Sequence, residues 1–206
     1  MPKKSHCMTI GPDCISNMPN LSVSGSSIMW VDSLSYLGIR IIACKKFKAD
    51  HTACRRKCFA DVNCIYSSCV DDLDKLFLME THYLPILMYA LEAMYFDATR
   101  CNEINSWWNS VYRKIFHFNK WESVSELILF LERLDYKSLY MLRKCKFIKS
   151  MSGSDNTILS YIMPFHLRSE EFMCFCGRSS LNIRMSVPKI KHILINRMHI
   201  KVVNSQ

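Results

Sequence analysis

The sequence is poor in glycine and proline, has no long hydrophobic run and begins without an apolar leader. Five glycines and six prolines among 206 residues exclude a collagen-like or proline-rich chain. The best candidate for a membrane span, residues 84–91, is much shorter than the roughly 18 apolar residues that such a span requires. No apolar run follows the basic N-terminus, so no signal peptide is predicted. We therefore expect no membrane partner and a location in the cytoplasm or nucleus.

Hydrophobic residues are plentiful, and the charge is unevenly spread. Hydrophobic side chains make up 50% of the residues, which excludes wholesale disorder. The net charge is +9, and residues 1–70, 104–180 and 181–206 are basic, whereas residues 71–103 are acidic. Nucleic acid is the commonest partner of a surface this basic. The alternative is that the positive charge only keeps the protein soluble.

Eleven cysteines are many for a chain without a secretion signal, and we expect them to be reduced thiols. Cys54 and Cys58 stand four residues apart on a predicted helix, where their role as small buried hydrophobes explains them better than a metal site. The spacing of Cys174 and Cys176 is too tight for an ordinary zinc knuckle. We expect no metal site, and zinc binding by Cys174 and Cys176 stays open at this point.

The hydrophobic pattern changes from alternating to helical between residues 42 and 47. Gly38 lies inside the last of three predicted strands, which are residues 20–24, 28–31 and 36–42. The predicted fold class is α+β and mostly α, with a small antiparallel sheet at about 20–42, a helical bundle at about 47–149 and an irregular tail. A composition break at residues 151–157 indicates a linker, which gives three segments: 1–42, 43–150 and 151–206.

The bundle is predicted to contain five helices. Pro85 should kink the second of them. Ser123 and Glu126 form a capping box before the fourth helix, and Ser138 can cap the fifth. The predicted helices are 47–67, 74–95, one from Asp97 or Thr99 to 116, one after Ser123, and one from Ser138 to 149.

No familiar catalytic motif is present. The sequence has no glycine-rich phosphate loop, no Gly-x-Ser-x-Gly and no His-Glu-x-x-His. Asp71 and Asp72 superficially resemble the Asp-Asp turn with which polymerases hold two metal ions. Asp74 and the helical pattern after it favour a helix start instead, because acidic side chains stabilise helix N-termini.

An aromatic and basic segment, residues 107–116, could stack on bases while its cations meet phosphates. The helical spacing of Trp108, Tyr112 and Ile115 favours a place in the core for these three residues. On the fifth predicted helix, Arg143 and Lys146 lie opposite a face that Met141, Cys145 and Ile148 share.

Several segments occur in an order that is typical of one protein family. Lys4-Ser5 precedes Trp30-Val31-Asp32 and Tyr36-Leu37-Gly38-Ile39. A helix with Arg55-Arg56-Lys57 follows, and then residues 83–93, residues 109–116 and Trp121-Glu122-Ser123-Val124. Together these segments, over roughly residues 3–149, resemble the reverse transcriptases of LINE-type (non-LTR) retrotransposons, in the part after the catalytic Asp-Asp turn.

The resemblance implies a palm end and primer grip in residues 1–42 and a thumb in the helices. Lys4 would then donate a proton to the leaving pyrophosphate, and Tyr36 and Gly38 would belong to the hairpin that steadies the primer 3′ end. The thumb would follow the backbone of an RNA/DNA template–primer duplex. The side chains that we expect to contact its phosphates are Arg55, Arg56, Lys57, Arg113, Lys114, Arg143 and Lys146.

One departure from the family concerns activity. The family's metal-binding Asp and its Asp-Asp turn would precede Lys3, and Asp71-Asp72 follows the segment similar to the primer grip. We therefore expect a fragment of an RNA-directed DNA polymerase that keeps nucleic-acid binding but synthesises no DNA by itself. The full-length family uses Mg²⁺, whereas no cofactor is expected in this chain.

Two other interpretations stay open. The chain could be a stand-alone helical module that binds nucleic acid, or a protein-interaction module in which the basic charge is incidental. A sheet that lacks its palm partner would also leave apolar residues exposed, which predicts self-association through the sheet.

Overall fold

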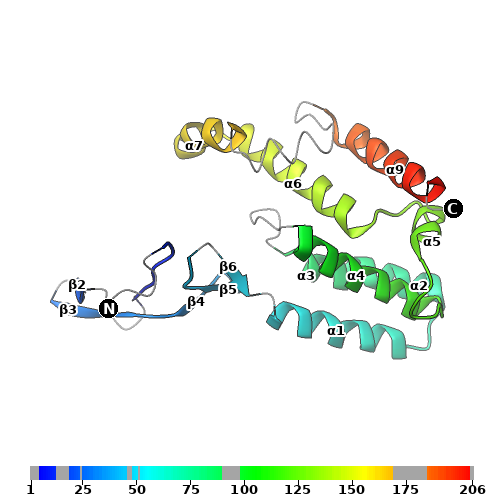
Figure 1. Ribbon diagram of the computed structural model, residues 1–206, viewed down its shortest axis with the longest axis horizontal. Helices are drawn as coiled ribbons and strands as arrows, with labels where there is room; N and C mark the ends of the chain where they lie inside the picture. The colour runs from blue at the N-terminus through cyan, green and yellow to red at the C-terminus, as the bar shows by residue number, and fades with distance from the viewer. Residues whose placement is uncertain are drawn as a thin grey trace. The chain divides into compact units, whose positions relative to one another are not determined.

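The structure is a computed structural model of the 206-residue chain (Figure 1). Short strands come first and helices follow, so the predicted fold class, α+β and mostly α, is confirmed. The contacts divide the chain into two compact units, Met1–Ala60 and Asp61–Gln206. The residues that the structure describes are 5–12, 19–23, 25–45, 48–50, 52–89, 98–168 and 185–204.

The described residues of the first unit form two small sheets. Their strands are β1 (His6–Cys7), β2 (Leu21–Val23), β3 (Ser26–Trp30), β4 (Ser33–Tyr36), β5 (Ile39–Ile42) and β6 (Lys48–Asp50). In the first sheet β3 is central and pairs parallel with β1 and antiparallel with β2. In the second sheet β5 is central and pairs antiparallel with β4 and β6. The strands thus continue past residue 42, into residues that were predicted to begin a helix.

The strand predicted at 36–42 is wrong, because the chain reverses in its middle. Leu37 and Gly38 have φ angles of 48° and 77° and connect β4 to β5. Two consecutive positive φ angles are characteristic of the type I′ hairpin turn, which favours glycine at its second central position. Gly38 therefore serves the turn and does not lie within a strand.

The first unit has little core among its described residues. Leu21, Val23 and Met29 of the first sheet are exposed, and so are Tyr36 and Leu37 of the β4–β5 hairpin. None of the described side chains before Val62 belongs to the buried hydrophobic set. Helix α1 (Thr52–Ser67) follows and continues across the division between the units.

A helical segment with a π-helical turn opens the second unit after α1. It consists of α2 (Asp72–Leu78), η2 (Met79–Tyr83) and α3 (Leu84–Leu87). The Leu84 N–H donates to the Met79 carbonyl oxygen, five residues back, which widens the helix by one residue. Pro85 follows directly, and it can neither donate a backbone hydrogen bond nor pack closely on the preceding turn. The distortion predicted at Pro85 is therefore present just before it.

Helix α4 (Ala98–Ile115) carries the centre of the helical core. Trp108, Tyr112 and Ile115 are each at most 1% exposed, as their helical spacing predicted. The Trp108 ring stacks on Tyr83 at 6.1 Å between centroids and meets Tyr112 edge-on at 5.5 Å. Asp97, the alternative cap of this helix, lies outside the described residues.

Two predicted helix caps are corrected by the structure. Helix α5 (Ser125–Phe130) begins after Val124, and Ser123 accepts a hydrogen bond only from the Ser125 N–H, at 3.4 Å. Helix α6 (Tyr136–Ser152) begins after Asp135, whose carboxylate accepts from the Ser138 N–H at 2.9 Å. Asp135 is the cap because its side chain lies three residues before that N–H and reaches it, as an N-cap side chain does.

Residues 151–206, predicted as an irregular tail, contain two helices, α7 (Thr157–Arg168) and α9 (Val187–Val203). Helix α7 contacts α6, and α9 contacts both α5 and α6. Ile190, Leu194 and Met198 recur every four residues and form the buried stripe of α9. No helix in the described ranges is long and apolar enough to cross a membrane.

Candidate nucleic-acid interface

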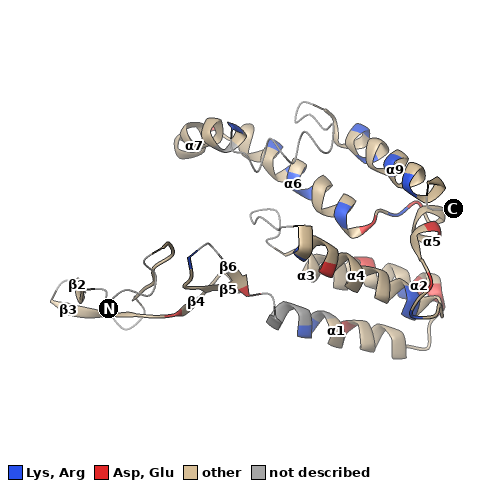
Figure 2. Cartoon of the chain, in the orientation of Figure 1, with Lys and Arg blue, Asp and Glu red and all other residues tan. Residues whose placement is uncertain are grey.

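Helix α6 is basic along its whole length. It contains five Lys or Arg residues and no Asp or Glu: Lys137, Arg143, Lys144, Lys146 and Lys149. The nearest carboxylate in sequence is its cap, Asp135, which the Ser138 N–H already engages. Figure 2 shows blue segments along α6 and red only at its start.

Helix α9 has the same composition and packs against α6. Its four cations are Lys189, Lys191, Arg197 and Lys201, again without any Asp or Glu. The Asp135 N–H donates to Met198 Sδ at 3.5 Å, and Lys149 Nζ donates to the Met185 carbonyl oxygen at 3.4 Å. These contacts hold α9 beside α6, so that nine cations share two adjoining helices.

Most of these cations reach the solvent. Lys146, Lys149, Lys189, Lys191 and Lys201 are exposed, and Lys137, Arg143 and Arg197 are half-buried. We call these eight residues the α6–α9 basic surface. Within it, Arg143, Lys146 and Lys149 stand three residues apart, which places them on successive turns of one side of α6.

Lys144 is the exception, because it is only 4% exposed. Its Nζ donates to Tyr140 Oη at 3.3 Å and lies 5.6 Å from the centre of the Tyr140 ring. A cation held over an aromatic ring inside the protein stabilises packing and cannot meet a phosphate in water.

The residues predicted to form the primer grip lie in the first unit. Tyr36 is 62% exposed at the end of β4, and Gly38 occupies the turn beside it. Arg40 donates two hydrogen bonds to Ser33 Oγ across the hairpin, at 3.1 and 3.3 Å. Lys4 lies outside the described residues.

The cations predicted on α1 also belong to the first unit. Arg56 and Lys57 are exposed on that helix, whereas the side chain of Arg55 lies outside the described residues. The α6–α9 basic surface belongs to the second unit.

Arg113 and Lys114 are engaged in contacts within the helical unit. Arg113 Nε donates to the Glu122 carbonyl oxygen at 2.7 Å and so ties the end of α4 to the loop that follows. Lys114 Nζ donates to Asn63 Oδ1 at 2.5 Å and lies 4.8 Å from the Tyr66 ring centre. Both side chains therefore hold α4 against its neighbours.

Arg143 and Lys146 lie where the helical pattern predicted them. Cys145 and Ile148 are buried, Arg143 is half-buried and Lys146 is exposed. Sequence reasoning did not identify the four cations of α9, because it treated residues 181–206 as a tail. The signal was present, however: Ser186 and Pro188 mark a helix start, and an apolar residue recurs every fourth position.

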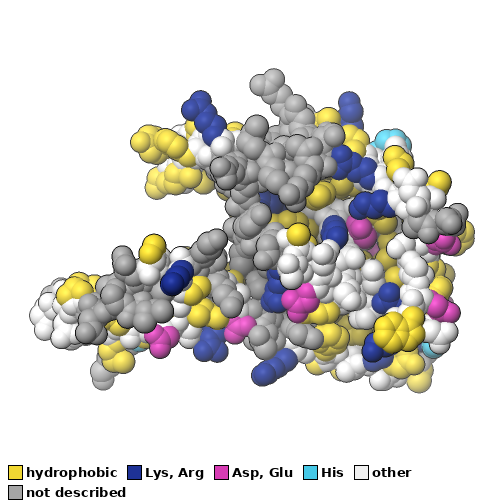
Figure 3. Space-filling model, in the orientation of Figure 1, with side chains coloured by type: hydrophobic (Ala, Val, Ile, Leu, Met, Phe, Trp, Pro, Cys, Tyr) yellow, Lys and Arg dark blue, Asp and Glu magenta, His cyan; other side chains and the backbone are white. Residues whose placement is uncertain are grey.

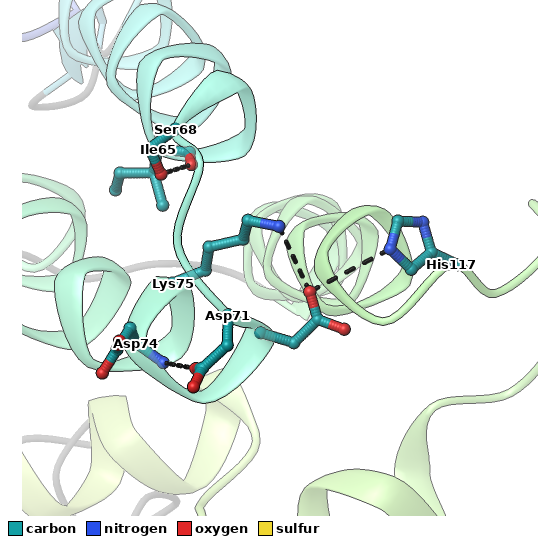
Figure 4. Close-up of polar contacts among 7 residues, drawn as sticks. Ile65, Ser68, Asp71, Asp74, Lys75 and His117 are labelled. Carbon is teal, nitrogen blue, oxygen red and sulfur yellow. Dashed lines mark hydrogen bonds and ion pairs between the residues drawn. The ribbon is translucent and has the colours of Figure 1, made fainter.

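The adjacent carboxylates Asp71 and Asp72 form a helix start, as predicted (Figure 4). Asp71 caps α2 by accepting from the Asp74 N–H at 2.8 Å. Asp72 forms an ion pair with Lys75 at 3.2 Å and lies 4.0 Å from His117. Among the described side chains, no group of three or more His, Cys, Asp and Glu residues lies close enough to hold a metal ion. Cys174 and Cys176 are outside the described residues.

The loop after α4 contains a carboxylate with a shifted pKa. Glu122 accepts from the Asn119 N–H at 2.6 Å and from Asn119 Nδ2 at 3.0 Å. These hydrogen bonds stabilise the ionised form and lower the pKa of Glu122. The loop thus closes on itself while Arg113 holds its backbone.

Comparison with known proteins found no match to this chain among family models, curated proteins or solved structures.

Proposed function

We propose that this chain binds double-stranded nucleic acid by its phosphate backbone, through the α6–α9 basic surface. The observation that carries the proposal is that two packed helices contain nine Lys or Arg residues and no carboxylate. A surface of this kind attracts a polyanion, and its cations release counterions when they bind.

The resemblance to LINE-type reverse transcriptases extends the proposal. In that setting the helical unit would act as a thumb on an RNA/DNA template–primer duplex, which is recognised largely by shape and backbone. The proposal is for binding and not for polymerisation, because the adjacent carboxylates Asp71 and Asp72 serve as the start of α2.

The proposed interface differs from the one that the resemblance implies, because it lies on α6 and α9 and not on α1 and α4. Arg113 and Lys114 are half-buried on a helix that also contains Glu103, whereas α6 and α9 contain no carboxylate. We therefore assign the phosphate contacts to α6 and α9, where Lys146, Lys189 and Lys191 are exposed. Of the cations implied by the resemblance, Arg143 and Lys146 remain in the proposed interface.

Fluorescence anisotropy with a labelled RNA/DNA hybrid, at several salt concentrations, tests the proposal. Each phosphate contact contributes roughly 0.9 to the log–log salt slope on B-DNA. Replacing Lys146, Lys189 and Lys191 with Ala should therefore flatten the slope by up to about 3. We expect the affinity to depend little on base sequence, because phosphate contacts do not read bases.

A matched control removes three cations that are already paired. Lys75 pairs with Asp72, Arg100 with Glu103 at 2.6 Å, and Arg133 with Glu80 at 2.6 Å. Changing Lys75, Arg100 and Arg133 to Ala alters the net charge equally but should leave the slope as in the wild type. Equal flattening in both triple variants would show that net charge alone drives binding, and the assignment to α6 and α9 would then be wrong.

We also propose that the exposed apolar residues of the first unit favour self-association, as predicted for a sheet without its palm partner. Val23, Met29 and Leu37 are 59%, 67% and 70% exposed, on short strands and a turn. Such edges and apolar faces promote contact between chains.

A further inference from the structure

Helix α7 has apolar side chains on two opposite sides. Met163 and Leu167 face α6, where they pack with Ile148 and Met151. On the other side, Ile158, Tyr161, Ile162 and Phe165 are 69%, 74%, 50% and 67% exposed. The side of α7 that faces solvent is therefore more apolar than the side that holds it to the protein.

The four exposed residues form one continuous face. They occupy positions i, i+3, i+4 and i+7, which lie on the same side of a helix. The Tyr161 and Phe165 rings are 5.8 Å apart between centroids. Figure 3 shows hydrophobic side chains gathered where Figure 1 draws α7. A helix that is apolar on both sides is normally covered on both sides.

We propose that this face, which we call the α7 face, docks against the α7 face of a second copy of the chain, with the two helices antiparallel. The α7 face is symmetric about the midpoint between Tyr161 and Ile162. In an antiparallel pair Tyr161 of each copy meets Ile162 of the other, and Ile158 meets Phe165. Self-complementarity of this kind is what a twofold interface requires.

The charges at the two ends of α7 select the antiparallel orientation. Asp155 precedes the helix and Arg168 is its last residue, both are exposed, and they lie at equal distances from the same midpoint. Antiparallel pairing therefore brings Asp155 of each copy level with Arg168 of the other. Parallel pairing would place like charges together and would align the two helix dipoles.

The chemistry of the face argues against nucleic acid as its occupant. Arg168 is the only Lys, Arg, Asp or Glu in α7, and it lies at the C-terminal end. One helix from each copy buries less than the roughly 1,200–2,000 Å² of a standard interface. The dimer should therefore be weak and depend on concentration.

Sedimentation equilibrium of the full chain over a range of concentrations tests the proposal. We expect reversible dimerisation that Tyr161→Glu with Phe165→Glu weakens at least about tenfold in Kd, because buried aromatic residues dominate such contacts. The matched control is Leu73→Glu with Phe77→Glu on α2, where two residues at the same spacing are 63% and 65% exposed. The control should dimerise as the wild type does, and circular dichroism checks that both variants fold.

Charge exchange tests the orientation. Asp155→Arg alone and Arg168→Asp alone should each weaken the dimer, and the two together should restore it, because the opposite pairing is re-formed with the signs exchanged. A chain that stays monomeric at all concentrations would overturn the proposal. So would association that the α7 variant leaves unchanged and that Met29→Glu in β3 abolishes, since the first unit alone, and not α7, would then join the two copies.

Discussion

The cations of α4 and those of the α6–α9 pair carry the same charge but have different surroundings. At the end of α4, Arg113 and Lys114 donate to a carbonyl oxygen and to a side-chain amide of their own unit. On α6 and α9, Lys146, Lys189 and Lys191 are exposed, and neither helix contains a carboxylate. Charge alone does not identify a binding surface; the exposure of each cation and the carboxylates on its helix decide how well it can reach a phosphate.

The largest expected effect concerns the packing that α4 provides. Trp108 is 1% exposed and stacks on Tyr83. Trp108→Ala should lower the free energy of unfolding by about 3–5 kcal/mol, because it leaves a large cavity. On α9, Ile200 is 61% exposed, so Ile200→Ala should change the free energy of unfolding by less than about 0.5 kcal/mol. Urea denaturation measures the free energy of unfolding of both variants. A similar loss in the two would contradict the claim that Trp108 of α4 lies in the core and Ile200 of α9 does not.

A smaller effect is expected where the α4 cations are removed. Arg113→Ala with Lys114→Ala should cost about 1–2 kcal/mol of stability, because each side chain loses a charge-assisted hydrogen bond that is partly exposed. The salt slope for duplex binding should not change. If the slope flattened by about 2 while the stability stayed constant, α4 would belong to the interface after all.

The hydroxyl of Tyr112 has no hydrogen-bond partner among the described residues, although it is buried. Tyr112→Phe should therefore leave the stability unchanged or raise it by up to about 1 kcal/mol. Burial raises the pKa of the Tyr112 phenol, with a further contribution from the charge of Glu80. The stability that depends on the neutral phenol is thus present below about pH 10 and lost as the pH rises further. Urea titrations at pH 8 and 11 should show a smaller alkaline loss in the variant than in the wild type.

The smallest effect concerns the loop that Arg113 holds. Because hydrogen bonds from Asn119 lower the pKa of Glu122, the stability from its carboxylate is present at neutral pH. It is lost as the pH falls below about 4 and the carboxylate is protonated. Glu122→Gln should show a weaker acid dependence of the thermal midpoint, and Asn119→Ala should show part of the same change. If the thermal midpoint fell equally at low pH in the wild type and in both variants, the Glu122 carboxylate would not stabilise the loop.

The fold class and the central helix could be predicted from the sequence because their signals are local. Trp108, Tyr112 and Ile115 repeat at helical spacing, and they are buried. The hairpin turn at Leu37 and Gly38 was not predicted, because apolar residues continue through it and hide the reversal. Helix boundaries moved where a stronger cap lay nearby, as Asp135 does before Ser138.

The site was predicted only in part. Arg143 and Lys146 follow from the pattern of α6, but the contacts of Arg113 and Lys114 involve Glu122 and Asn63, which no helical pattern brings together. Helix α9 was not predicted because residues 181–206 were interpreted as a tail, although Ser186 and Pro188 mark a helix start there. Its pairing with α6 is a tertiary contact that no local pattern reports.

Footprinting of lysines by acetylation, with and without a bound RNA/DNA hybrid, tests the central claim most directly. Mass spectrometry reports the reactivity of each exposed lysine in the same sample. We expect the duplex to protect Lys146, Lys189 and Lys191, while Lys57 on α1 and Lys120 after α4 react as in the free protein. Protection confined to Lys57 and Lys120, with Lys146, Lys189 and Lys191 unchanged, would contradict the assignment of the interface to α6 and α9.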